Sequence, residues 1–143
     1  MKGKIKLTLF AAIFASQLCS GQSFNTPEEA ARSHHGALMS LDNSSVAKTS
    51  QFPFVHIQPD GSKYYMESAA ELPELSGLPY RSKITELKTI EETSSTAVVR
   101  LVFRRTALQG EPAGVATAYW GAIKSSGTWL ISWRHLLQVD TDA

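Results

Sequence analysis

The chain has 143 residues, 19% of them charged, and a formal net charge of +1. This length fits a single domain. No basic block with interleaved aromatic residues is present, which argues against a nucleic-acid partner. The one cysteine excludes an intramolecular disulfide framework.

Residues 1–21 are predicted to be a cleavable secretory signal peptide. Three lysines stand among the first six residues, and residues 7–18 form an apolar segment too short to span a bilayer. Cys19 raises the alternative of a lipoprotein, but the bulky Leu18 before it does not suit a lipobox. We therefore expect a secreted or periplasmic domain of residues 22–143, without membrane attachment after cleavage. It would have no cysteine and a formal charge of −2.

A helix is predicted to begin at Pro27. Thr26 suits the N-cap position, and Glu29 completes a capping box three residues later. The helix should run to about Leu41, with an apolar stripe of Ala30, His34, Ala37, Leu38 and Leu41. This spacing places His34 inside the buried face and His35 toward its edge.

The middle of the chain reads as short elements separated by turns. The expected elements are a short helix over 44–49, strands over 54–57 and 63–66 joined by the turn 58–61, a short helix over 69–72 and a strand over 82–90. There are no internal repeats.

Three β-strands are predicted at the C-terminal end of the chain. The segments 97–105, 115–123 and 129–137 are rich in β-branched and apolar residues and are separated by Gly- and Ser-containing turns. They should form an antiparallel meander whose apolar face needs a helix to cover it.

The element order and several short motifs resemble the NTF2-like superfamily, and in particular its SnoaL-like branch. The motifs are Ala37-Leu-Met-Ser-Leu-Asp42, Phe52-Pro-Phe-Val-His-Ile57, Asp60-Gly61, Met66-Glu-Ser68 and Gly127-Thr-Trp-Leu-Ile131. The resemblance implies an α+β, cystatin-like cone. A long N-terminal helix and short helices would pack on a curved, mostly antiparallel sheet around a pocket open at one end. It also implies a homodimer, because many members dimerise through the outer face of the sheet.

The superfamily also includes ketosteroid isomerase, and the resemblance implies where its catalytic groups would lie. Counted without gaps, the carboxylate base falls on Gln58 and the carbonyl-polarising tyrosine falls on His34. A glutamine amide cannot abstract a proton. Between residues 97 and 137 the only acid is Glu111, in a turn. Asp60 lies close to Gln58, so a shift of the count by two residues would restore a carboxylate.

Alternation along the last strand suggests candidate catalytic histidines. One face would carry Trp129, Ile131, Trp133, His135 and Leu137, and this mostly apolar set should face the interior. His34 and His135 could then act together as a general acid and base near pH 7. The alternative is that each is a buried, hydrogen-bonded structural histidine.

Four residues are candidate ligand contacts: Arg134, His56, Tyr119 and Trp133. A guanidinium group would hold an anion, and the aromatic rings would hold a flat apolar body. The alternatives are a solvated sheet face for the arginine and a core role for the rings. The alternation leaves the direction of His56 open and places Arg105 opposite Arg100 and Arg104.

Neither a metal ion nor another cofactor is expected, since His34 and His35 diverge on the helix and the sequence has no His-x-x-x-His pair. The sequence thus predicts an exported protein that binds a small apolar or anionic molecule in the cavity or acts as an accessory protein. The alternatives are a histidine-dependent dehydratase, isomerase or hydrolase, and a protein-interaction module that uses the outer sheet face.

Overall fold

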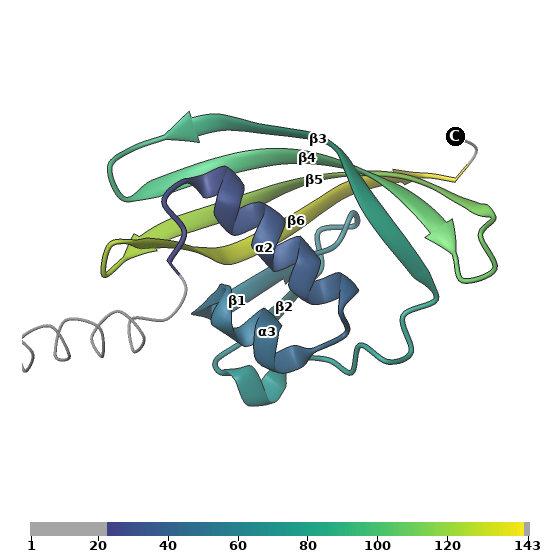
Figure 1. Ribbon diagram of the computed structural model, residues 1–143, viewed down its shortest axis with the longest axis horizontal. Coiled ribbons are helices and arrows are strands. Elements are labelled where there is room, and N and C mark those ends of the chain that lie inside the picture. The colour runs from purple at the N-terminus through teal and green to yellow at the C-terminus, as the bar shows by residue number, and fades with distance from the viewer. Residues whose placement is uncertain (1–22, 142–143) are drawn as a thin grey trace, which may run out of the picture.

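The computed structural model describes residues 23–141, and Figure 1 shows two helices lying against one face of a curved sheet. The helices are α2 (Pro27–Met39) and α3 (Asn43–Lys48). The strands are β1 (Ser50–Ile57), β2 (Lys63–Met66), β3 (Tyr80–Glu92), β4 (Thr96–Ala107), β5 (Pro112–Ser125) and β6 (Thr128–Asp140), and a 3₁₀ turn covers Ala69–Glu71. The predicted signal peptide lies outside the described residues.

The six strands form one sheet in the order β2-β1-β6-β5-β4-β3. All neighbours are antiparallel except β1 and β6, which pair in parallel. The predicted meander is therefore confirmed as β4, β5 and β6. The α+β character and the mostly antiparallel sheet are confirmed with it.

Helix α2 begins as its sequence predicts and ends two residues before Leu41. Thr26 accepts a hydrogen bond from the backbone N–H of Glu29 at 3.1 Å. The carboxylate of Glu29 binds the backbone N–H of Asn25 at 2.8 Å, one residue before the position that a capping box implies. Both bonds satisfy amide groups that a helix start otherwise leaves open.

Strand β1 begins at Ser50, four residues earlier than predicted, and it includes Pro53. Proline lacks the N–H that a regular ladder needs. The structure accommodates it where the pairing with β6 is irregular, between Ser50 and Val55, and where β2 does not yet pair with β1. The sequence signal was weakened by this proline, although the backbone there is extended.

The core lies between α2 and the inner face of the sheet. Its fully buried members include Leu101 and Ile131 from the sheet and Ala30 and Ala31 from the helix. Small alanines on the helix allow it to lie close to the strands, because they add little volume at the contact. His34 is also fully buried there, at 0% exposure, as the helical stripe predicts.

Candidate functional site

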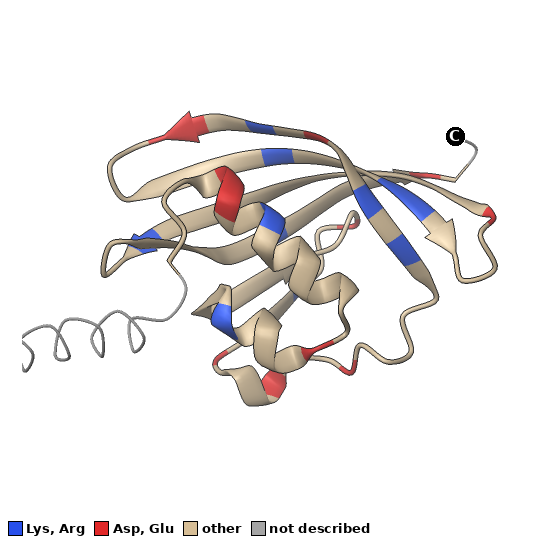
Figure 2. Ribbon diagram, viewed as in Figure 1, with Lys and Arg blue, Asp and Glu red and all other residues tan. Residues whose placement is uncertain are grey.

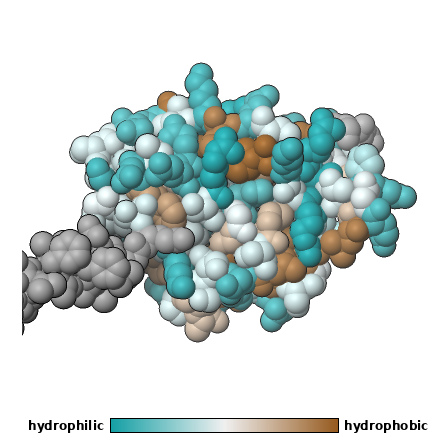
Figure 3. Space-filling view, in the orientation of Figure 1, coloured by the Kyte–Doolittle hydropathy of each residue, from teal (hydrophilic) through white to brown (hydrophobic). Residues whose placement is uncertain are grey.

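A cavity of about 230 Å³ opens between the C-terminal half of α2, the inner face of the sheet and the loop before β3. Its apolar wall includes Leu38, Leu78, Phe103, Trp120 and Leu136. Its volume lies just below the range of roughly 300–1,000 Å³ typical of drug-sized pockets. The space therefore suits a small ligand. On the face of the molecule in Figure 3, apolar side chains gather in small areas between polar ones.

The polar groups of the cavity wall are cationic or neutral. They are His35, His56, Gln58, Tyr80, Ser82, Arg105 and Arg134. Among the described residues no Asp or Glu lines this cavity, so the predicted scarcity of acids on its walls is confirmed. Gln58 stands in the wall where the resemblance to ketosteroid isomerase would need a carboxylate.

Arg134 is a half-buried cation on β6. Its guanidinium carbon lies 5.0 Å from the ring centre of Phe54, in cation–π geometry. Burial lowers the pKa of Arg134 to about 10, and Tyr80 acts in the opposite direction, so the group stays charged at pH 7. Its Nε is buried and has no hydrogen-bond partner within residues 23–141. This side chain thus lines the cavity and has one hydrogen-bond donor without a partner among the described residues.

Arg105 supplies the second guanidinium of the wall. Its carbon lies 4.2 Å from the ring centre of Tyr80. Arg105 and Tyr80 sit on the paired strands β4 and β3, and the predicted opposition of Arg105 to Arg100 and Arg104 is consistent with its place in the cavity. Two positive side chains without a facing carboxylate give the cavity a positive potential.

His56 lies beside Arg134 in the cavity wall. Its side chain is therefore on the inner face of the sheet, which the alternation in the sequence had left open. The pKa of His56 is lowered to about 4, mainly by burial and further by Arg134 and His135. The ring is therefore neutral at pH 7. Its Nδ1 is buried and has no hydrogen-bond partner in the described part of the chain, so its hydrogen-bonding capacity is unsatisfied.

The sequence pattern predicted which side chains of the last strand point to the interior. This prediction is wrong beyond Ile131. The pairing of β5 and β6 shifts between Gly121 and Ala122, so that Ser132 is an extra residue in β6. One extra residue reverses the alternation of the side chains that follow, here as far as Leu136, because a second shift makes Leu137 another extra residue. Arg134 and Leu136 therefore line the cavity, whereas Trp133 and His135 lie on the outer face.

Trp133 and Tyr119 occupy the outer face together with His135. Trp133 pairs with Gly121, and Tyr119 pairs with His135. A Cβ atom built on Gly121 would lie 1.9 Å from Nε1 of Trp133, so the indole rests on this glycine. Of the four candidate ligand contacts, Arg134 and His56 line the cavity. Tyr119 and Trp133 do not, because they stand on the other side of the sheet.

We expect Gly121→Ala to destabilise the fold by about 1–3 kcal/mol, because the added methyl group must displace the Trp133 ring. Gly36→Ala is the matched control. Gly36 lies in α2 with nothing within 4 Å of a built Cβ, and it should stabilise the protein by about 1 kcal/mol. Urea unfolding of both variants measures the difference. Equal midpoints would contradict the packing of Trp133 on Gly121.

His34 lies in the core behind the cavity wall. Its ring is stacked on Phe54 at 5.8 Å and meets Trp120 edge-on at 5.2 Å. Its Nδ1 is 2.9 Å from Oγ1 of Thr49, and that hydroxyl donates to the carbonyl of Val46. Nδ1 therefore carries the proton, and Nε2 is left buried without a partner in the described residues. Burial, Arg134 and His35 lower the pKa of His34 well below its usual value.

His34 and His135 are not brought together. His34 is enclosed in the core on the inner face, and His135 belongs to the outer face. The expected convergence of the two rings on one cavity is therefore wrong, and its cause is the extra residue at Ser132. The structure thus removes the geometry on which an acid–base pair of these two residues depends.

Sequence reasoning missed a hydrogen-bonded pair in the cavity wall, His35 and Ser82. Nε2 of His35 lies 2.9 Å from Oγ of Ser82. His35 comes from α2, and Ser82 comes from β3, 47 residues later. The helical spacing had placed His35 at the edge of the buried face, but no pattern in the sequence indicated its partner.

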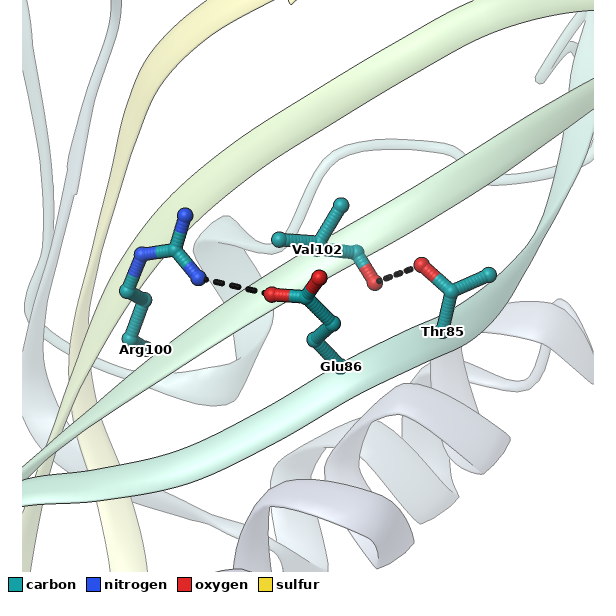
Figure 4. Close-up of polar contacts among 4 residues, drawn as sticks. All are labelled: Thr85, Glu86, Arg100 and Val102. Atoms are coloured by element: carbon teal, nitrogen blue, oxygen red, sulfur yellow. Dashed lines mark hydrogen bonds and ion pairs between the residues drawn. The ribbon is translucent and has the colours of Figure 1, made fainter.

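The outer face of β3 and β4 carries an ion pair, which Figure 4 shows. Nη1 of Arg100 lies 2.9 Å from Oε2 of Glu86. Beside it, the hydroxyl of Thr85 donates to the carbonyl of Val102. Both ionic side chains are well exposed, so the pair contributes little stability. In Figure 2 lysines and arginines are spread along the sheet strands with acidic residues between them.

A second cavity of about 400 Å³ adjoins the first. The two share His56, Gln58 and Arg134, and the second adds Tyr64, Tyr65 and Glu71. Arg134 is thus reachable from both spaces. Glu71 gives the second cavity an acidic group that the first one lacks among its described residues.

Residues 23–141 show neither a metal-binding cluster nor a membrane-spanning helix. They contain no group of three or more His, Cys, Asp or Glu side chains that could hold a metal ion. No helix within this range is long and apolar enough to cross a membrane.

The sequence matches no protein-family model and no curated protein. Solved structures are similar in fold. An NTF2-like protein of unknown function from Pseudomonas putida is 15% identical, with a TM-score of 0.63 over 76% of this chain and 80% of that chain. A protein of unknown function with a cystatin-like fold from Nostoc punctiforme is 16% identical, with a TM-score of 0.62 over 78% and 86%. A candidate ketosteroid isomerase from Shewanella frigidimarina is 15% identical, with a TM-score of 0.61 over 75% and 90%.

These likenesses establish the fold of the chain as NTF2-like, which confirms the resemblance seen in the sequence. At such low sequence identity, similarity of fold does not indicate an activity for this chain. The SnoaL-like branch stays a prediction.

Proposed function

We propose that this exported NTF2-like protein binds a small molecule with an apolar body and an anionic group in the cavity next to α2. The anion binds Arg134, and the apolar body contacts the leucine and aromatic side chains of the wall. The observation that carries the proposal is the half-buried Arg134 in the cavity wall, whose Nε is buried and lacks a hydrogen-bond partner among the described residues.

The cost of burying Arg134 supports this role. A buried charge is destabilising unless a partner of opposite charge and hydrogen bonds offset it. The neighbours of Arg134 include the face of Phe54, the neutral ring of His56 and the hydroxyl-bearing ring of Tyr80. None of these three groups carries a negative charge at pH 7. An anionic ligand would complete the site, because a guanidinium group binds carboxylate oxygens in a bidentate manner.

The neutral His56 beside Arg134 is compatible with a ligand that carries one ionised carboxylate. His56 is uncharged at pH 7, and its Nδ1 can donate or accept one hydrogen bond, depending on the tautomer. The positive charge at this end of the cavity therefore comes from Arg134. A single carboxylate group is sufficient to neutralise it.

The ligand class is tested by calorimetry with matched probes. Benzoate and hexanoate are expected to bind, whereas benzamide and hexan-1-ol, which keep the apolar body and lose the charge, are expected to bind at least tenfold more weakly. Native mass spectrometry of protein purified from its own host would show any retained acid. Equal affinity for the charged and neutral probes would overturn the proposal.

A second candidate function is protein interaction through the outer sheet face, including formation of a homodimer. The observation that favours it is the aromatic character of this face, on which Trp133 of β6 and Tyr119 of β5 lie on neighbouring strands. Aromatic residues of this kind are enriched at interfaces. Sedimentation of the wild type and of Trp133→Ala measures whether this face joins two copies.

A further inference from the structure

We propose that Ser82 and His35 form a nucleophile and general-base pair that cleaves small esters bound in the same cavity. This inference rests on the proposed function, because the substrate is an ester that carries an apolar body and an anionic group. It extends that function from binding to acyl transfer.

The two side chains have the geometry that the reaction needs. Nε2 of His35 and Oγ of Ser82 are 2.9 Å apart, which is within the hydrogen-bond reach required of a base and its nucleophile. Both residues line the cavity. The imidazole is held in place by stacking on Phe103, with ring centres 5.3 Å apart and planes 25° from parallel.

His35 is available as a base near neutral pH. Burial lowers its pKa, with Arg32 acting in the same direction and a hydrogen bond to the backbone of Ser82 acting against both. The neutral ring accepts a proton at Nε2 in the tautomer that carries its hydrogen on Nδ1. The other acceptor near the Ser82 hydroxyl is Sδ of Met39 at 3.6 Å, a weaker acceptor at a longer distance.

A cation lies across from the nucleophile. Arg105 is the direct partner of Ser82 in the β3–β4 pairing, and both side chains line the cavity. The stacking of its guanidinium on Tyr80 fixes it on the same side of the sheet. A fixed positive charge at this place would stabilise the negative oxygen that develops during attack on a carbonyl group.

The reaction proceeds in two steps, acylation of Ser82 and hydrolysis of the acyl-serine. Oγ of Ser82 attacks the ester carbonyl carbon while its proton passes to Nε2 of His35. The carbon–oxygen bond to the alcohol then breaks, and the imidazolium returns the proton to the leaving oxygen, which gives an acyl-serine and a free alcohol. Water attacks this acyl group with His35 again taking the proton, and the acid and free Ser82 are released.

A fluorophosphonate probe tests the pair directly. Intact mass and peptide mapping are expected to show one adduct, on Ser82. Ser82→Ala should give none. His35→Gln and His35→Phe, the second of which keeps the stacking on Phe103, should slow the labelling by about 100-fold or more. Ser132→Ala is the control, because its half-buried hydroxyl binds the carbonyl of Gly121 on another strand.

Hydrolysis of mono(4-nitrophenyl) glutarate, an ester that carries a carboxylate, measures turnover in the same set of variants. Labelling at another residue, or a Ser82 adduct formed at an unchanged rate in both His35 variants, would overturn the inference. Its failure is distinguishable from failure of the proposed function. Ser82→Ala should still bind benzoate if only the chemistry is absent, whereas Ser82 would still be labelled if only the anion site is wrong.

Discussion

Arg134→Met is expected to remove most of the affinity for carboxylate ligands and to raise the stability of the unliganded protein. Hydrogen bonds to a charged group contribute roughly 1.5–3 kcal/mol, so the affinity for benzoate should fall about 10- to 150-fold. At the same time, a half-buried cation whose buried Nε has no hydrogen-bond partner in the described residues is replaced by an apolar side chain that can pack on Phe54. Such replacements are often stabilising, by about 1–4 kcal/mol.

The opposite signs of the two effects make this variant informative. Calorimetry measures the affinity, and thermal unfolding without ligand measures the stability. A gain of 1 kcal/mol should raise the midpoint by about 4 °C in a domain of this size. Arg100→Met is the matched control, because Arg100 is exposed on the outer face and paired with Glu86. It should change neither quantity substantially. A destabilised Arg134→Met protein with unchanged affinity would show that Arg134 is structural.

Acidification from pH 7 to pH 5 is expected to destabilise the protein strongly, because its buried histidines are held neutral. The pKa of His34 is lowered well below 6.5 in the folded state. Below pH 6.5 the unfolded chain therefore binds a proton that the folded chain does not, and the free energy of unfolding falls as the pH falls. The slope is about 1.4 kcal/mol per pH unit for each such group. His56 adds to the loss down to about pH 4, where it becomes charged in the fold.

His34→Phe isolates the contribution of one residue. Phenylalanine keeps an aromatic ring between Phe54 and Trp120 and removes the unpartnered Nε2. The free energy of unfolding is measured with urea at pH 7.5, 6 and 5. Its decrease on acidification below pH 6.5 to pH 5 should be smaller in this variant than in the wild type by about 2 kcal/mol. An unchanged slope in this variant would contradict a lowered pKa of His34 in the folded protein, because a group with the same pKa in both states contributes nothing to the slope.

The helix and strand positions followed from local signals in the sequence. The N-cap at Thr26, the proline at the first helical position and the apolar stripe through His34 are properties of short segments, and each is present in the structure. The three C-terminal strands were also visible, because β-branched runs between glycine-containing turns depend on near neighbours alone. Their ends lie within a few residues of the predicted ones.

The candidate site was predicted only in part, and Ser132 shows why. Alternation assumes a regular strand, but the register between β5 and β6 shifts at this residue. The shift sends Arg134 into the cavity and His135 to the outer face. A bulge depends on how two strands fit each other, and a pattern in one strand does not contain that information. The same limit applies to Ser82, which meets His35 only because β3 passes beside α2.

By itself, therefore, the sequence determined the class of fold, the buried face of α2 and the near absence of acidic residues from the meander. These depend on residue type and on spacing over a few positions. The tertiary structure decided which cationic and polar side chains share a cavity. Arg134, His56, His35 and Ser82 come from four separate elements, and the packing of those elements and the register of the strands bring them to one place.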